Sequence, residues 1–196
     1  AGGGIPQPLL PPNIALQNPH LIGGMPFCVF NKLGKILLMV DQDGDENYLP
    51  MLIPLDGGFP EMAFKDFFNG TRCHLMECDV DKGIVYLVAE SRMEPTSATY
   101  RCNVRTGKVT LIAQSTWGQY PAAYSKDHRR VALVEGYTTG DVVLMLWHEG
   151  KKAPEVLYGV PLEERKPDQT MPLSGIGSVC FANEERGLLL TTVLYE

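Results

Sequence analysis

The sequence of 196 residues contains no long apolar run and no concentration of positive charge. Its apolar stretches, such as 36–40 and 187–190, are far shorter than the roughly 20 residues that a membrane-spanning helix requires. With 17 basic and 23 acidic residues, the chain has a formal net charge of −6 and no basic stripe that could neutralise phosphates. These absences argue against a membrane partner and against a nucleic-acid partner.

Signals for secretion are also missing from the sequence. Residues 1–8 have neither a basic start nor a continuous apolar segment, so they do not resemble a secretory signal. The cysteines number five, which is odd, and four of them lie in apolar or strand-like contexts rather than at regular disulfide spacing: Cys28, Cys73, Cys102 and Cys180. We therefore expect reduced, buried thiols in a cytoplasmic protein.

Helical periodicity is the next feature that the sequence lacks. No segment repeats apolar residues at helical spacing over ten or more positions, whereas 15 prolines and 20 glycines suit many short strands joined by turns. Four segments instead repeat a polar turn followed by an apolar, β-branched run. When Ile36, Ile84, Val131 and Leu188 are taken as equivalent positions, the repeats are 48, 47 and 57 residues apart. A period of this size indicates propeller blades.

Each repeat divides further into short apolar runs separated by turns. The first runs are 25–30, 73–78, 120–124 and 178–181, and the second are 35–41, 84–90, 129–135 and 188–193. The third runs are 48–55, 98–104 and 142–147. Glycine-containing turns follow them and lead into fourth runs at 60–64, 109–113 and 154–158. Four strands per repeat are typical of a propeller blade.

The sequence therefore predicts an all-β fold, a partial β-propeller of four-stranded antiparallel blades. Residues 1–24 are predicted to be an extended Pro/Gly-rich lead-in, and 25–196 an incomplete propeller. The predicted blades cover about 25–66, 71–115, 118–160 and 171–196, which makes three complete blades and part of a fourth. A β-sandwich is the competing all-β prediction, but it explains the period less well. The charged insertion 161–170 is expected to stand out from one face.

The predicted fourth blade has only its first two strands. A closed propeller has about four to eight complete blades, so we expect either a fragment or a chain that another chain completes. The open blade edge presents unpaired backbone groups and is expected to cause self-association.

An acidic segment at 41–47 resembles a calcium-binding loop, since hard cations prefer carboxylate oxygens. An EF-hand loop needs glycine at its sixth position and glutamate at its twelfth. Here Gly44 is fourth and Leu52 occupies the twelfth position. We therefore interpret the segment as a solvated turn between two strands.

A second cluster, Cys73-His74 with Cys78, contains residue types that bind zinc. On a regular strand Cys73 and Cys78 point to opposite faces, and His74 lies roughly 13 Å from Cys78. One tetrahedral metal cannot use all three, so the sequence favours a structural role for them.

Catalytic motifs are not recognisable. The segment 173–178 superficially resembles the Gly-x-Ser-x-Gly elbow of α/β-hydrolases but does not match it, and no phosphate-binding glycine loop is found. His20, His128 and His148 lie beside no recognisable nucleophile. We accordingly assign no catalytic, cofactor-binding or metal residue and expect no cofactor. Five aromatic residues are predicted to be core, with a recognition face as the alternative: Trp117, Tyr120, Tyr124, Tyr137 and Trp147.

The repeats resemble a known family at several segments. Residues 40–48, followed by the Ile-Pro-Leu-Asp-Gly-Gly sequence of 53–58, resemble blade sequence of the prolyl oligopeptidase family of serine peptidases. The resemblance is closer to its acylaminoacyl-peptidase and dipeptidyl-aminopeptidase branch, whose propellers also resemble the TolB type. Segments 136–141 and 158–165 are similar in the same way, and the resemblance covers nearly the whole chain from about residue 20.

This resemblance implies a function that the motifs alone do not. In that family a propeller caps an α/β-hydrolase domain, which carries the catalytic triad, and restricts access to bulky substrates. The hydrolase half has no counterpart in this sequence, so no catalytic residue is carried over. The resemblance implies a non-catalytic capping domain of a serine peptidase, whose partners are an α/β-hydrolase domain and a peptide substrate.

Two other functional classes stay open. One is a stand-alone TolB-like propeller that binds a protein or a peptide through its face loops. The other is a propeller enzyme such as a lactonase, which would need a central metal whose carboxylates the sequence does not identify.

Overall fold

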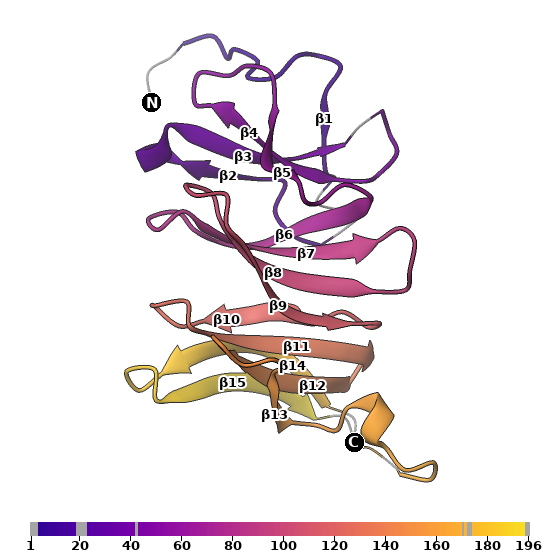
Figure 1. The fold of residues 1–196 in the computed structure, drawn as a ribbon. Coiled ribbons are helices and arrows are strands. Elements are labelled where there is room, and N and C mark those ends of the chain that lie inside the picture. The colour runs from indigo at the N-terminus through magenta and orange to yellow at the C-terminus, as the bar shows by residue number, and fades with distance from the viewer. Residues whose placement is uncertain (1–3, 19–22, 42, 170, 172–173, 195–196) are drawn as a thin grey trace. The chain divides into compact units, whose positions relative to one another are not determined.

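The computed structural model describes residues 4–18, 23–41, 43–169, 171 and 174–194, and within them the chain is all-β (Figure 1). The first sheet has five strands: β1 (Ala15–Leu16), β2 (Phe27–Phe30), β3 (Lys35–Asp41), β4 (Leu49–Pro54) and β5 (Glu61–Asp66). A single 3-10 turn, η1 (Asn31–Leu33), connects β2 to β3, and Gly34 closes it with a φ of 64°. β1 and β2 pair with different halves of the same edge of β3.

The second and third sheets each have four strands in chain order. The second contains β6 (Thr71–Asp79), β7 (Ile84–Ser91), β8 (Ser97–Asn103) and β9 (Val109–Ser115). The third contains β10 (Tyr120–Tyr124), β11 (Arg130–Thr138), β12 (Asp141–His148) and β13 (Glu155–Tyr158). The fourth sheet has two described strands, β14 (Ser174–Ala182) and β15 (Gly187–Leu194). A 3-10 turn, η2 (Leu162–Glu164), lies between the third and fourth sheets in the sequence.

The all-β class and the four-stranded antiparallel units predicted from the sequence are confirmed. The repeated second runs correspond to β3, β7, β11 and β15. β3, β7 and β11 are inner strands of their sheets, and β15 is the second strand of a pair. The short strand β1 was not predicted: it lies within the lead-in and extends the first sheet through the pairs Ala15 with Asp41 and Leu16 with Val40.

None of the described helices, which are single 3-10 turns, is long and apolar enough to cross a membrane.

The chain divides into two compact units. Unit 1 contains Ala1–Pro95 and Tyr100–Thr110, and unit 2 contains Thr96–Thr99 and Leu111–Glu196. The division passes through β8 and β9, so the first sheet belongs to unit 1 and the third and fourth sheets belong to unit 2.

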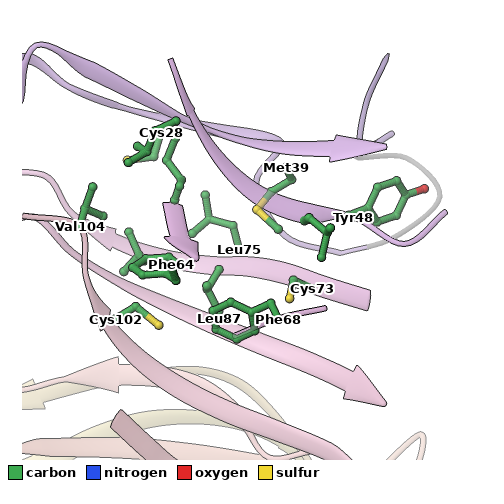
Figure 2. Packing of buried hydrophobic residues seen from close by; sticks show 14 of the residues in the cluster. Cys28, Met39, Tyr48, Phe64, Phe68, Cys73, Leu75, Leu87, Cys102 and Val104 are labelled. Atoms are coloured by element: carbon green, nitrogen blue, oxygen red, sulfur yellow. The ribbon is translucent and has the colours of Figure 1, made fainter. Parts of the chain in front are cut away.

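The core of unit 1 lies where the first and second sheets face each other. Leu37 and Met39 of β3 contribute to the same buried cluster as Leu75 of β6 and Leu87 of β7. Figure 2 shows Phe64, Phe68 and other members of this cluster. The Phe68 ring meets the Phe64 ring edge to face, with centroids 5.8 Å apart. Aromatic pairs of this geometry stabilise a core beyond the area they bury.

The lead-in covers the opposite face of the first sheet. Successive side chains of a strand point to opposite faces, so Ile36, Leu38 and Val40 of β3 face away from the main core. Leu10, Ile14 and Leu16 of the lead-in pack against them. A cavity of about 450 Å³, lined mainly by apolar side chains of residues 8–16, β2, β3 and β4, remains between the lead-in and this face.

In unit 2 the fourth sheet packs against the third. Ala132 of β11 and Leu144 of β12 form a buried cluster with Val179 of β14, and Leu188 and Leu190 of β15 pack against it. An ionic contact joins the same two sheets: Arg130 Nη2 lies 3.2 Å from Glu185 Oε2, and Arg130 Nη1 donates to the Glu185 carbonyl at 2.6 Å. Hydrophobic contact and charge thus fix the fourth sheet on the third.

Candidate functional site

A buried carboxylate in the third sheet is the most unusual polar feature of unit 2. Glu135 lies on β11 and is only 2% exposed. Its Oε1 accepts a hydrogen bond from the Tyr137 hydroxyl at 2.5 Å, and its Oε2 accepts one from Gln119 Nε2 at 3.0 Å. The register of β11 with β12 shifts between Gly136 and Thr138, so Tyr137 lies at a β-bulge two positions from Glu135.

Neutral hydrogen-bond donors stabilise this carboxylate. Removing a carboxylate from water is costly unless other groups replace the lost hydrogen bonds. Burial raises the pKa of Tyr137, and its hydrogen bond to Glu135 raises that pKa further, although a hydrogen bond from the Leu162 amide opposes the shift. Tyr137 therefore keeps its proton at neutral pH and remains a donor to Glu135.

Gln119 contributes a donor and leaves an acceptor without a partner. A carboxylate only accepts hydrogen bonds, so the Gln119 amide must present its nitrogen to Glu135. The Thr99 hydroxyl donates to the backbone carbonyl of Gln119 and holds this residue in place just before β10. Gln119 Oε1 is buried and has no hydrogen-bond partner among the described residues. A buried acceptor of this kind requires an explanation.

A cavity of about 450 Å³ opens beside Glu135 and Gln119. Apolar side chains from β9, β12 and β13 line it, including Ile112, Met145 and Val156. Besides Glu135, its charged lining comes from two pairs of exposed residues, Lys151 with Lys152 and Glu163 with Glu164. Apolar walls with a few convergent polar groups are the usual features of a ligand site.

Arg165 fixes the segment that contains Glu163 and Glu164. Its Nη1 and Nη2 donate to the two carboxylate oxygens of Asp141, each at 2.7 Å, and its Nε donates to the Val160 carbonyl at 3.0 Å. Its guanidinium also lies over the Tyr137 ring, 4.8 Å from the centroid. The insertion 161–170 was expected to stand out, but these contacts tie its first residues to the third sheet. Position 170 lies outside the described residues.

Gly159 allows the chain to turn from β13 into this segment. Its φ is 82°, in the left-handed region where residues with a side chain are strained. A Cβ added at this position would also lie 2.6 Å from the Val142 carbonyl oxygen, so only glycine fits here.

Ser125, Asp127 and His128 include the residue types of a nucleophilic triad, but their geometry is that of a turn. The Ser125 hydroxyl donates to Asp127 Oδ1 at 2.7 Å and accepts from the Arg130 amide at 3.0 Å. The His128 ring stacks on Tyr124 with centroids 4.8 Å apart, and the His128 amide donates to the Ser125 carbonyl at 2.8 Å. Ser125 is fully buried, so these residues stabilise the β10–β11 connection. His20 lies outside the described residues.

The cysteine cluster of β6 differs from the prediction. The strand register shifts between Leu75 and Glu77, which adds one residue and reverses the alternation beyond it. Cys78 therefore packs against the same core as Cys73, and the expectation that the two point apart was wrong. The thiol of Cys78 forms a hydrogen bond with Cys28 on β2. No group of three potential metal ligands comes together within the described residues.

All five cysteines are free thiols, but they are not all buried. Cys28, Cys73 and Cys102 are buried, Cys78 is partly buried, and Cys180 is exposed on β14. The prediction of buried thiols was therefore wrong for Cys180. Its place on a strand was correct.

His74, the third member of that cluster, contacts Glu90 of β7. His74 is 3% exposed, and its Nε2 lies 3.3 Å from Glu90 Oε1. Arg72 Nη1 approaches the other carboxylate oxygen at 4.0 Å. The interaction with His74 lowers the pKa of Glu90, and the nearby charges of Arg72 and Arg92 lower it further against the opposing effect of burial.

The acidic segment 41–47 lies in the connection between β3 and β4, and position 42 is outside the described residues. Its side chains bond within the turn: Asp41 Oδ1 accepts from the Glu46 amide, and Asp45 Oδ1 accepts from the Asn47 amide. Arg72 of β6 also contacts Glu46, at 3.3 Å between Nη2 and Oε2.

The five aromatic residues have different environments. Trp147 is a core residue, 3% exposed, whereas Trp117 is 46% exposed and meets the Tyr137 ring edge to face at 5.5 Å. Tyr120 and Tyr124 are partly buried on β10. Tyr137 of this group donates a hydrogen bond to Glu135.

Glu135 and Gln119 were not identified from the sequence. Glu135 ends the apolar run 129–135 and could have been noticed as an acidic residue that shares a strand face with Leu133. Gln119 offers no comparable signal, because its role depends on a side-chain contact across 16 positions in the chain.

Comparison with known proteins finds no match: no model of a protein family fits the sequence, and no curated protein is similar to it.

A pH titration of stability tests the His74–Glu90 contact. A carboxyl whose pKa is lowered on folding stabilises the protein above its unfolded pKa and loses that contribution as the pH falls through the lowered value. Replacing Glu90 with Gln should therefore reduce the free energy of unfolding at pH 7, and the deficit should shrink below about pH 4. Urea unfolding at several pH values measures this. Exposed Glu94→Gln is the control, and a deficit that does not change with pH would contradict the pairing.

The Arg165→Lys variant tests how the segment 160–165 is held. Lysine keeps the positive charge but cannot form the bidentate pair with Asp141 or reach Val160 at the same time. We expect a loss of about 1–3 kcal/mol in the free energy of unfolding of unit 2 and faster amide exchange at residues 160–165. Arg129→Lys, which alters an exposed pair with Glu149, is the matched control. Unchanged exchange in Arg165→Lys would show that other contacts hold the segment.

Proposed function

We propose that this chain is a non-catalytic part of a β-propeller that caps the active site of a prolyl oligopeptidase-like serine peptidase in the cytoplasm and restricts substrate access. Its partners are then an α/β-hydrolase domain, in the same chain or in another, and the peptide substrate. The observation that carries the proposal is the repetition of meander sheets with strands in chain order. A blade of a propeller is built in this way.

The side chains of the described residues support a role in binding rather than in chemistry. Ser125 is committed to a turn, and the His74 imidazole faces a carboxylate rather than a nucleophile. The three buried cysteines also favour a reducing compartment, since free thiols persist there.

A stand-alone TolB-like propeller that binds a peptide or a protein is the second candidate function. The cavity beside Glu135 favours it, because a partly apolar hollow with a buried carboxylate can hold a ligand without any other domain.

The native polypeptide that contains this sequence distinguishes the two candidates. We expect its intact mass to exceed that of the 196 residues by the size of a hydrolase domain, and we expect a fluorophosphonate probe to label a serine in the additional part. The 196-residue chain itself should bind peptides without hydrolysing them. A native polypeptide that adds only the strands needed for closure, and that the probe does not label, would favour the stand-alone binding module.

The edge of β15 gives a separate prediction about the 196-residue chain. Within the described residues β15 pairs only with β14, which leaves its other edge open, and Leu189 on β15 is 63% exposed. We expect the apparent mass to rise with concentration in size-exclusion chromatography with light scattering. Leu189→Lys should reduce this association, and Met93→Lys, at an exposed position in unit 1, should not. A monomer at all concentrations with cooperative melting would contradict the prediction.

A further inference from the structure

We propose that the cavity beside Glu135 binds a basic side chain of a peptide ligand, through its ammonium or guanidinium group. This inference names a ligand class for the peptide-binding role proposed above and rests on that role. It is carried by the buried acceptors at the cavity wall and by the charge of the carboxylate.

Two residues with acceptor oxygens, Gln119 and Glu135, line the cavity. An ionised carboxylate offers about four lone-pair sites, and the Gln119 amide and the Tyr137 hydroxyl supply one hydrogen bond to each oxygen of Glu135. Gln119 Oε1 adds an acceptor that is buried and without a partner among the described residues. A group with several N–H donors would satisfy both residues at once.

The negative charge of Glu135 at the cavity wall favours a cationic ligand group. Glu135 is 2% exposed, and the hydrogen bonds described above come from neutral groups, which do not cancel its charge. A buried carboxylate repels phosphates and carboxylates, and its attraction for a cation is stronger away from water. An ammonium or a guanidinium group therefore fits, and an anionic ligand group does not.

The remaining lining fits the stem of a basic side chain and the peptide that bears it. Ile112, Met145 and Val156 offer apolar contact to methylene groups, as lysine and arginine stems require. The cavity also reaches the exposed Lys151 and Lys152, which can donate to backbone carbonyls of a peptide. The cavity volume of about 450 Å³ lies within the usual range of small-ligand sites.

Calorimetric titration of the 196-residue chain with three probes tests the inference. The probes are Nα-acetyl-lysine amide, Nα-acetyl-arginine amide and the neutral isostere Nα-acetyl-norleucine amide. We expect the two cationic probes to bind and the norleucine probe to bind at least about tenfold more weakly. Equal binding of all three would overturn the cation assignment while leaving a peptide-binding role. If no probe binds, the proposed site is overturned, and the cavity holds only ordered water. The proposed function is then still decided by the experiment on the native polypeptide.

Substitutions at the cavity test whether the lysine and arginine probes bind beside Glu135. Glu135→Gln keeps the shape of the side chain but removes its charge, so affinity for the lysine and arginine probes should fall about tenfold or more. Glu94→Gln, which neutralises an exposed carboxylate in unit 1, is the control and should bind as the unaltered chain does. If Glu135→Gln does not fold, Val156→Trp fills the cavity from a position that is already 39% exposed and should abolish binding. Unchanged affinity in a folded Glu135→Gln or Val156→Trp variant would overturn the inference.

Discussion

Burial on both faces of the second strand in each of the first three repeats, β3, β7 and β11, is the constraint on which the structure depends. β3 alternates between two clusters, with Leu37 and Met39 on one side and Ile36 and Leu38 on the other. A strand of this kind must be covered twice, because either face left in water would expose a row of apolar side chains. In unit 1 the second sheet covers one face and the lead-in covers the other.

The same constraint explains why Glu135 stands out. β11 places Val131 and Leu133 in full burial, and Glu135, which is 2% exposed, continues the same strand face. A carboxylate there remains only if donors replace its hydration, which accounts for the contacts of Tyr137 and Gln119. Those donors are fixed in turn by Leu162 and Thr99. Glu135 replaces an apolar side chain at this strand position, and its hydrogen bonds to Tyr137 and Gln119 offset the packing that is lost. These residues lie beside a cavity, which favours a role in binding.

Strand positions could be predicted from the sequence, whereas the site could not. Strands such as β3, β7 and β10 follow from apolar runs between turns, and these are local properties of the chain. The bulge after Leu75 is not local, since it depends on how β6 pairs with β7, and it reversed the expected side of Cys78. The Arg165–Asp141 pair spans 24 positions and ties Arg165, within the insertion 161–170, to the third sheet. Contacts between residues so far apart in the sequence produce no periodic pattern that could be recognised.

Strand order bears on the choice between a propeller and a sandwich. A Greek-key sandwich places strands from distant parts of the sequence next to one another, so its sheets interleave the chain. In the second and third sheets each strand pairs with its neighbour in sequence, and the fourth sheet begins in the same way. The first sheet departs from this order only because β1 and β2 share one edge of β3. Sequential order through successive sheets is what repeated blades produce, and it supports the propeller proposal over the sandwich.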